Sequence, residues 1–344
     1  MLQLHDIKIS GYERVVRGTN DTTGLNALIA IHNTRLGPAL GGIRFKEYES
    51  DEEQCVDAMR LAEAMSLKNS LCGINKGGGK ATINALGIAK TPELYESFGE
   101  FVESLDGLYI AAGDFGTTTE DLIEVNKATR HVGGIKFDSS KYTALGVAHA
   151  IIAWKSIALP DVDPSEFYVA ISGLGKVGYK LALRLAEQGY PLYVADINSS
   201  PHKLVEEIGQ KTSVYVGNHE DIHETLCHVF SPCALGGVIN YETREKLGCR
   251  AIIGAANNQV DNLDTVEWLR EHNIDYITDY LVNAGGVIAI DNEVSGDCNE
   301  STIERMTHDI YVRTNNLMVS KRATGHSFDF EAQRAARKRI NDAR

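Results

Sequence analysis

A glycine fingerprint near the middle of the chain constrains its fold more than any other feature. The apolar run 167–172 leads straight into Gly173-Leu-Gly175-Lys-Val-Gly178, a helical pattern follows, and the next apolar run ends at Asp196. The G-x-G-x-x-G pattern alone is weak, but a preceding strand, a following helix and a closing acidic residue are typical of a dinucleotide-binding βαβ unit. Asp196 would accept hydrogen bonds from the adenosine ribose and repel a 2′-phosphate, which predicts NAD rather than NADP.

The alternation of strands and helices continues beyond the fingerprint. Three further apolar runs are predicted to be buried strands whose carboxyl ends carry small or amide residues, and in an open parallel sheet those ends face the ligand crevice. Asn257, Asn258 and Asn283 could each be a turn former, but three such strand ends in one crevice favour a binding role. The runs are 229–234, 251–258 and 277–286.

The second constraining feature is a pair of lysines around a run of glycines. A helical pattern that opens with the capping box Ser50-Asp-Glu-Glu53 ends at Lys68, and Lys80 follows directly after the glycines 77–79. Three glycines in a row lose much backbone entropy on ordering, so we expect either a backbone that comes close to a ligand or a tight turn that aims Lys80, ahead of the predicted strand 81–86. A lysine buried there would lose its proton more easily than in water. The alternative is a glycine-rich turn beside two surface lysines, with Lys68 serving only the helix dipole.

An acidic residue follows another buried strand. The run 108–112 is predicted to be a strand that ends at Gly113-Asp114-Phe115-Gly116, just before a helix. An aspartate in this place is commonly a turn former, and it becomes a candidate for chemistry if Lys68 and Lys80 point into the same cleft. Two more strands are predicted at 6–18 and 25–32, and another helix from Thr91.

Composition narrows the classes of function. The 344 residues suit two domains, and the net charge of −13 argues against broad binding to nucleic acid or to anionic membranes. No apolar stretch reaches membrane-spanning length, and the N-terminus carries no signal-peptide core. Six scattered cysteines without paired spacing, together with the lack of a His-Glu-x-x-His pattern, indicate reduced thiols in a cytoplasm and predict no metal site.

Seven motifs in a fixed order give a resemblance to a known family. Together they resemble the Glu/Leu/Phe/Val amino acid dehydrogenases over nearly the whole chain, and the leucine/valine branch most closely. Seven ordered motifs are far more specific than any one of them. They are the stretches 37–44, 65–80, 113–117, 173–178, 231–234, 256–259 and 283–287.

The resemblance implies a fold and a reaction. The chain would be an α/β protein with an N-terminal α/β catalytic domain (1–138), a Rossmann-type NAD-binding domain (139–319) and a C-terminal helix (320–344) that returns to the first domain. The active site would lie in the cleft between the domains. The reaction would be the reversible, NAD-dependent oxidative deamination of an L-amino acid to its 2-oxo acid and ammonia. The family is oligomeric, so a homo-oligomer is expected.

The resemblance also assigns roles to three residues. Lys68 falls on the lysine that binds the substrate carboxylate, Lys80 on the catalytic lysine and Asp114 on its acidic partner. The chemistry agrees with these roles, because two lysines in one cleft disfavour each other's charge. Lys68 can then stay charged against the carboxylate while Lys80 takes a proton from water, and Asp114 can carry the proton of the amino group.

Residues within and beside the motifs predict the substrate side chain. Leu40 stands where glutamate-specific relatives place a lysine, and Ala112, Val287 and Ile290 would complete a small aliphatic wall. These four residues, called the side-chain wall below, predict leucine, valine or isoleucine as the substrate. Asn257 is expected to contact both substrate and cofactor. The other expected cofactor contacts are Thr143, Gly173, Leu174, Gly175, Lys176, Val177, Gly178, Asp196, Cys233, Ala234, Ala255 and Asn283.

Three residues depart from the family pattern. Lys76 and Phe115 replace apolar or smaller aliphatic residues close to the expected pocket, and Ser172 replaces an amide before the fingerprint. We expect Lys76 to be a solvated side chain that points away from the substrate, since exposed lysine is the usual case. If it points inward, it would supply the charge that Leu40 lacks and admit polar or acidic substrates. The alternatives to an aliphatic substrate are an aromatic L-amino acid, such as phenylalanine or tryptophan, and a nucleotide-sensing module that has lost the chemistry.

Overall fold

The chain folds into two compact units. The computed structural model describes residues 1–198, 200–208 and 211–343. Unit 1 contains Met1–Asp138, Ala289–Asn299 and the C-terminal residues from Ala335, and unit 2 contains Ser139–Ile288 and Glu300–Arg334. This grouping differs from the expected division in two places, because Ala289–Asn299 joins unit 1 and the C-terminal segment joins it only from Ala335.

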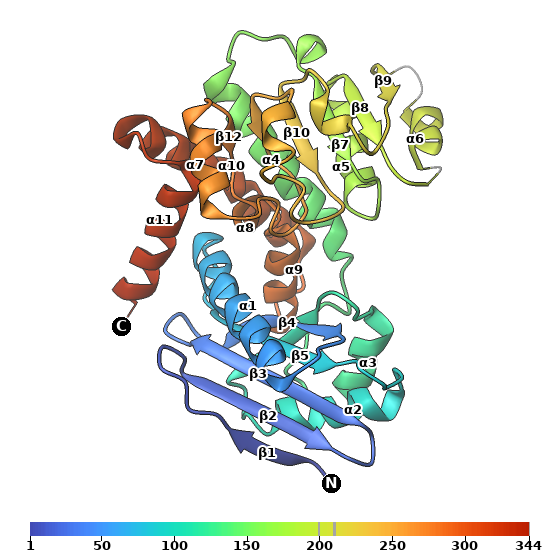
Figure 1. Ribbon diagram of the computed structural model, residues 1–344, viewed down its shortest axis with the longest axis vertical. Coiled ribbons are helices and arrows are strands. Elements are labelled where there is room, and N and C mark those ends of the chain that lie inside the picture. The colour runs from blue at the N-terminus through green and yellow to red at the C-terminus, as the bar shows by residue number, and fades with distance from the viewer. Residues whose placement is uncertain (199, 209–210, 344) are drawn as a thin grey trace. The chain divides into compact units, whose positions relative to one another are not determined.

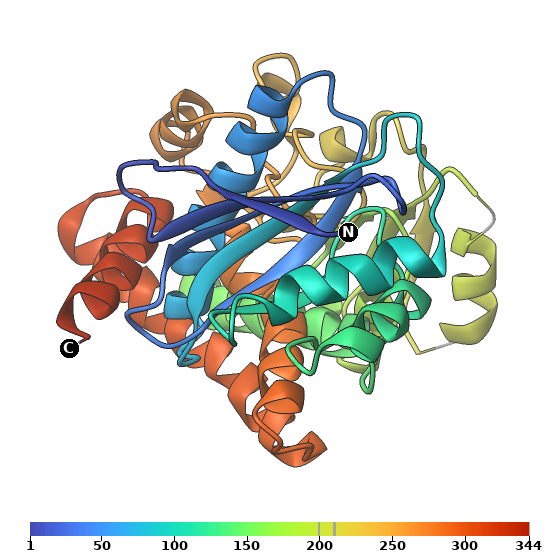
Figure 2. The same cartoon turned by 90° about the horizontal axis from the view of Figure 1, so that it is seen from below.

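Unit 1 is built on one mixed sheet of six strands within the described residues. The strand order is β1-β2-β3-β5-β4-β6, antiparallel from β1 to β5, with β4 parallel to both β5 and β6. Helix α1 covers one face of this sheet, and α2 and α3 cover the other (Figures 1 and 2). The elements are β1 (Gln3–Asp6), β2 (Arg14–Asn20), β3 (Leu25–Asn33), β4 (Ala39–Lys46), α1 (Asp51–Leu71), β5 (Gly77–Asn84), α2 (Pro92–Glu103), β6 (Tyr109–Gly113) and α3 (Thr119–Ala128).

Alternation along the strands divides the apolar residues of unit 1 between two cores. Leu28 and Ala30 of β3 pack with Ala58 and Ala62 of α1. Their neighbours in β3 point the other way and join the phenylalanines of α2. Ala30, Ala58 and Ala62 are small, which lets the backbone of α1 lie close to the sheet at this point.

The glycines 77–79 form the start of strand β5 and not the expected turn. None of the three has a positive φ, so conformational freedom is not what the site requires of them. They are needed for space, because a Cβ on Gly78 would come within 2.2 Å of the Ser66 backbone in α1, and one on Gly77 within 2.0 Å of the Asn33 carbonyl. The missing side chains let β5 run directly under α1, with Lys80 as its fourth residue.

Two other expectations for unit 1 need correction. The predicted strand 6–18 is two strands, β1 and β2, because the chain turns around Gly11, whose φ of +87° suits glycine. An amphipathic helix in this place would bury Val56, but Val56 is 58% exposed, and the polar Gln54 is buried beside Ala58 and Ala62. The predicted caps are confirmed at Ser50, which accepts from the Glu53 N–H, and at Thr91, which accepts from the Leu94 N–H.

Unit 2 contains a fully parallel sheet, again of six strands within the described residues. The order β12-β11-β10-β7-β8-β9 is that of a doubly wound dinucleotide-binding fold. This strand order confirms the Rossmann-type architecture that the sequence predicted. The elements are α4 (Ser139–Ala158), β7 (Val169–Ser172), α5 (Gly178–Glu187), β8 (Leu192–Ala195), α6 (Ser200–Ile208), β9 (Val214–Val216), β10 (Val229–Pro232), β11 (Ala251–Ile252), α7 (Leu263–Glu271), β12 (Asp275–Tyr276), α8 (Asp279–Val282) and α10 (Glu300–Thr324).

The predicted strand 277–286 is wrong. After the two-residue strand β12 the chain forms α8 and then α9 (Gly285–Val294). Buried apolar helices and buried strands give the same short apolar run, which periodicity cannot separate. The glycines at the start of α9 have a packing role, since a Cβ on Gly285 would meet the Tyr142 carbonyl oxygen of α4 at 1.8 Å.

The segment from Ala289 is tied to unit 1 by hydrogen bonds from a buried carboxylate. Glu293 of α9, 8% exposed, accepts the backbone N–H groups of Gly134, Ile135 and Lys136 at 3.1–3.2 Å. The sequence offered no signal for this grouping, because the acceptor and its donors lie more than 150 residues apart.

The C-terminal part is two helices instead of the single helix expected over 320–344. Helix α10 ends at Thr324, Gly325 takes a φ of +77°, and α11 spans Phe328–Asp342. Arg344 lies outside the described residues. Among the described residues, none of the helices combines the length and the apolar character that crossing a membrane requires.

Candidate active site

Lys80 and Asp114 form an ion pair in unit 1. The Lys80 Nζ lies 2.8 Å from Asp114 Oδ2, and the lysine is only 4% exposed. Lys80 stands on β5 and Asp114 follows the end of β6, with β4 between those strands. Gly42 of β4 leaves the space, because a Cβ there would lie 2.7 Å from Asp114 Cβ and 3.2 Å from Lys80 Nζ. Two residues predicted from separate motifs are therefore brought together.

A second cation, Arg44, completes the cluster, and the sequence analysis gave it no role. Its Nε donates to the same oxygen of Asp114 at 3.0 Å, and its Nη1 reaches Asp57 of α1 at 3.2 Å. Asp57 is also held by the Tyr48 hydroxyl at 2.8 Å. An arginine inside the mostly buried strand β4 was the signal available in the sequence, since buried charges are normally paired.

The electrostatics keep Asp114 ionised and make Lys80 easier to deprotonate. Burial favours the neutral acid, but the charges of Lys80 and Arg44 outweigh burial and lower the pKa of Asp114 to about 2. Burial lowers the pKa of Lys80 from its ordinary value. Asp114 opposes this shift, while the positive charges of Arg44 and Lys68 add to it. The Lys80 ammonium group therefore loses its proton more easily than that of a lysine in water.

Lys68 stands in the last turn of α1, as predicted, close enough for its charge to act on Lys80. The next residue, Asn69, fixes this end of the helix over the sheet. Its side-chain amide donates to the Leu40 carbonyl of β4 at 3.2 Å and to the Gly77 carbonyl of β5 at 2.6 Å. The position of Lys68 is therefore set by hydrogen bonds to two strands of the cluster.

Two members of the side-chain wall lie on the same face of the sheet as Lys80. Leu40 is fully buried on β4 and pairs with Gly78 of β5, and Ala112 is 4% exposed on β6 beside Gly42. Side chains two residues apart in a strand share a face, so Leu40, Gly42 and Ala112 all face the α1 side. The other two members, Val287 and Ile290, lie on α9.

The two departures nearest the cluster have different environments. Phe115, directly after Asp114, is 67% exposed. Lys76 is not the solvated side chain that was expected: it pairs with Asp291 of α9 at 3.1 Å, and its side chain is 14% exposed. The expectation failed because the partner lies more than 200 residues away in the sequence, where nothing local marks the contact.

The fingerprint of unit 2 fits a dinucleotide. Gly173 has a φ of +93° and would place a Cβ 2.6 Å from Ala234, while a Cβ on Gly178 would meet the Gly173 carbonyl oxygen at 1.9 Å. Gly175 is exposed, and a Cβ there would meet nothing within 4 Å. This is the arrangement of a tight turn, an open approach for the pyrophosphate and close helix–strand packing.

The other expected cofactor residues lie around the same sheet. Asp196, at the end of β8, accepts from the Leu174 N–H of the fingerprint at 2.5 Å. Asn283 donates to the Asn257 side chain at 2.8 Å and to the Ala255 carbonyl at 3.1 Å, so these residues do converge. Cys233 follows β10 and lies beside Gly178, and Thr143 lies beside Gly286. Lys176 is exposed, and Val177 directly precedes α5.

Comparison with known proteins decides the family. A family model described as Glu/Leu/Phe/Val dehydrogenase, dimerisation domain, matches residues 9–131, and one described as Glutamate/Leucine/Phenylalanine/Valine dehydrogenase matches residues 192–343. The chain belongs to this family. It is therefore an amino acid dehydrogenase, an oxidoreductase that works with a nicotinamide cofactor.

Relatives of this amino acid dehydrogenase divide by substrate. Phenylalanine dehydrogenase of Lysinibacillus sphaericus is 40% identical over 317 residues, covering 88% of this chain and 82% of the relative. Leucine dehydrogenase of Bacillus subtilis (strain 168) is 37% identical over 343 residues, covering 97% and 92%. The crystal structure of L-tryptophan dehydrogenase from Nostoc punctiforme superposes with a TM-score of 0.86 at 33% identity and covers 97% of each chain.

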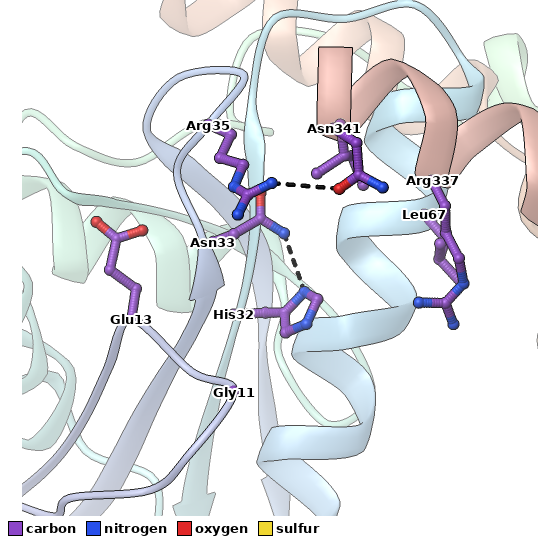
Figure 3. Close-up of a pocket in the computed structure, with 9 residues that line it drawn as sticks. Gly11, Glu13, His32, Asn33, Arg35, Leu67, Arg337 and Asn341 are labelled. Atoms are coloured by element: carbon purple, nitrogen blue, oxygen red, sulfur yellow. Dashed lines mark hydrogen bonds between the residues drawn. The ribbon is translucent and has the colours of Figure 1, made fainter. Parts of the chain in front are cut away.

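The dehydrogenase also carries a pocket of about 370 Å³ in unit 1, apart from the residues predicted for catalysis (Figure 3). Its charged groups already have partners within the chain: Arg35 donates to Asn341, Arg337 pairs with Glu63, and Glu13 accepts from Thr34. The pocket is lined by Gly11, Glu13, His32, Asn33, Arg35, Leu67, Arg337, Ile340 and Asn341.

Proposed function

We propose that this dehydrogenase catalyses the reversible, NAD-dependent oxidative deamination of a small aliphatic L-amino acid, with leucine, valine and isoleucine as substrates. The observation that carries the proposal is the buried Lys80–Asp114 ion pair, with Lys68 at the end of α1 and with Leu40 and Ala112 on the same face of the sheet. The products are the 2-oxo acid, ammonium, the reduced cofactor and one proton, which balance one zwitterionic amino acid, one water and one oxidised cofactor.

Each charged group of the cluster has a task. Lys68 binds the substrate carboxylate and orients the reacting carbon. Bound NAD supplies the acceptor for the hydride that leaves Cα. Lys80, whose pKa is lowered by burial and by neighbouring cations, takes the proton from the water that attacks the imine carbon. Asp114 takes a proton from the ammonium group of the bound amino acid and returns it to the amino group when that group leaves, while Arg44 holds the Asp114 carboxylate in place.

The side-chain wall supports an uncharged substrate. Leu40 and Ala112 are buried and offer no hydrogen-bond donor from their side chains, so a substrate carboxylate placed against them would lose its solvation without a partner. Burying an unpaired carboxylate costs on the order of several kcal/mol, which should exclude glutamate. Valine is one methylene smaller than leucine and isoleucine, which are isomers, and a methylene is worth only about 1–3 kcal/mol, so all three should react.

An aromatic amino acid is the second candidate. Phe115 exposes a large ring immediately after Asp114, where it could contact an aromatic substrate. Relatives named phenylalanine and tryptophan dehydrogenase add weight to this alternative.

One experiment separates the candidates: formation of NADH from NAD, or of NADPH from NADP, is followed by absorbance with a panel of L-amino acids. The proposal expects kcat/KM for leucine, valine and isoleucine to exceed that for phenylalanine, tryptophan and glutamate. Higher kcat/KM for an aromatic substrate would transfer the assignment to the second candidate. No oxidation of any amino acid would refute both.

Assembly belongs to the same proposal. One of the matching family models is described as a dimerisation domain, and it spans most of unit 1. We expect the dehydrogenase to be a homo-oligomer, which light scattering on the purified full chain would test.

A further inference from the structure

An ion pair that joins two elements of unit 1 is not used by the mechanism above. Lys76 Nζ lies 3.1 Å from Asp291 Oδ1 and 3.4 Å from Ser295 Oγ. The two charged side chains are only 14% and 12% exposed, so water screens them poorly. Such a pair differs from the exposed ion pairs of the chain, which contribute little and tolerate loss of either partner.

Asp291 shares a helix face with half of the side-chain wall. In α9 the residues Val287, Ile290, Asp291 and Val294 are spaced i, i+3, i+4 and i+7, which places them on one face. Ile290 and Val294 of this face lie beside Gly133, where an added Cβ would meet Val294 at 2.5 Å and Ile290 at 3.1 Å. Asp291 is therefore the residue next to Ile290, which is proposed to contact the substrate side chain.

Lys76 approaches the same region from the other side. It directly precedes Gly77, the first residue of β5, and Gly78 pairs in register with Leu40 of the wall. The Asn69 side chain ties the Gly77 and Leu40 carbonyls together, so the backbone next to Lys76 cannot shift away from the wall independently. The pair thus connects the β4–β5 side of the wall, at Leu40, with its α9 side, at Ile290.

The pairing of Lys76 with Asp291 determines the net charge beside the side-chain wall, and so the charge that a bound substrate side chain meets. Two opposite charges in contact cancel for a substrate side chain nearby, whereas removal of one partner leaves the other buried and uncompensated. A lone lysine would attract a substrate carboxylate, and a lone aspartate would attract an ammonium group. The same lysine can therefore be compatible with an aliphatic substrate only because Asp291 neutralises it.

We propose that Lys76 and Asp291 are a specificity-determining ion pair that keeps the side-chain wall electrically neutral and so excludes charged amino acids. This inference rests on the proposed function, because it concerns the side chain of that substrate. Either residue alone turns the enzyme toward substrates of opposite charge.

The test compares kcat/KM for leucine, glutamate and lysine in four forms of the full chain: wild type, Asp291→Asn, Lys76→Met and the double variant. Asp291→Asn should raise the glutamate-to-leucine ratio by about tenfold or more, since an unpaired cation is then available. Lys76→Met should raise the lysine-to-leucine ratio in the same way. The double variant, neutral again, should return both ratios to near the wild-type values.

A control variant and the ratios between substrates separate this specificity role from a purely structural one. Asp342→Asn removes one partner of the exposed Lys338–Asp342 pair, 77% and 62% exposed, and should change no ratio. If Asp291→Asn and Lys76→Met lower kcat/KM for every substrate by one common factor, the pair is only a structural link and the proposal is overturned. If Asp291→Asn does not fold, Lys76→Met and the double variant decide in the same way. Failure of the proposed function can be told apart from failure of the ion-pair proposal, because in the first case the wild type oxidises no aliphatic amino acid.

Discussion

Arg44 donates its Nε–H to Oδ2 of Asp114 at 3.0 Å, the same oxygen that faces Lys80 at 2.8 Å. The same carboxylate oxygen thus contacts both cations. Arg44 and Lys80 are therefore close together in a buried cluster, and the positive charge of Arg44 lowers the pKa of Lys80. Perturbed titration at a cluster of this kind is what general base catalysis near neutral pH requires.

The pH dependence of catalysis should respond to Arg44. If neutral Lys80 is the base, kcat/KM rises as pH rises through the pKa of Lys80. The charge of Arg44 lowers that pKa, so Arg44→Gln should raise it and move the rising limb of the pH profile to higher pH. Arg44→Lys keeps the charge and should move the limb much less. A limb that stays in place in Arg44→Gln would remove Lys80 as the titrating base.

Substitution of Lys80 and substitution of Lys68 should change different steady-state parameters. Lys80→Ala should lower kcat by about 10²–10⁴-fold, because the proton acceptor is lost, while NADH binding measured by fluorescence stays intact. Lys68→Ala should chiefly raise the KM for the amino acid. Lys90→Ala, which breaks an ion pair with Asp121 on α3, is the matched control and should behave as wild type. Near-normal turnover in Lys80→Ala would contradict the mechanism.

Acid stability should depend on Asp114. Its folded pKa of about 2 lies below its ordinary 3.8, so the stabilisation is fully present above about pH 4 and is lost as pH falls through 2. The difference corresponds to on the order of 2 kcal/mol. Asp114→Asn should therefore lose less stability between pH 4 and pH 2 than wild type, as chemical denaturation at several pH values would show. Parallel stability curves for the two proteins would argue against the ion pair.

A methyl group on Gly78 should destabilise the fold. The added Cβ would lie 2.2 Å from the Ser66 backbone, which cannot move without shifting α1. Overpacking of this kind costs about 1–3 kcal/mol, so Gly78→Ala should melt at a lower temperature. Gly217→Ala provides the control, because a Cβ there meets nothing within 4 Å and the backbone is not left-handed. Equal melting temperatures would show that β5 has more room than the distances imply.

Cofactor preference should depend on the charge of Asp196. We expect wild type to prefer NAD, since the carboxylate at the end of β8 would repel a 2′-phosphate. Asp196→Asn keeps an acceptor for the Leu174 N–H and removes the charge, so it should narrow the preference mainly by weakening NAD. A wild-type enzyme that favours NADP would show that another residue reads the ribose.

The sequence predicted the parts of this fold that depend on local pattern. The βαβ unit around Gly173 and the caps at Ser50 and Thr91 are local, and each is present. The Lys80–Asp114 pair was reached because each residue lies in its own recognisable motif. The helices over 277–286 were missed because a buried apolar run carries no periodicity that separates helix from strand.

Contacts between distant residues could not be predicted in the same way. Arg44 meets Asp57 and Asp114, which lie 13 and 70 residues away, and nothing local marks either contact. Lys76 was expected in solvent because an isolated lysine usually is, and only the fold brings Asp291 to it. The glycines 77–79 were expected to turn because glycine is flexible, whereas the structure uses them because they have no side chain.

The glycine start of β5 also limits how this enzyme can change its substrate. Enlarging a binding site normally means shortening a side chain, and the three positions before Lys80 have none to shorten. They also cannot gain one, since each added Cβ would strike neighbouring atoms at 2.9 Å or less. If the proposed side-chain wall contacts the substrate, new substrate range, whether in evolution or in the laboratory, is to be sought on β4, β6 and α9, at Leu40, Ala112 and Ile290, while strand β5 with the proposed base Lys80 stays the same.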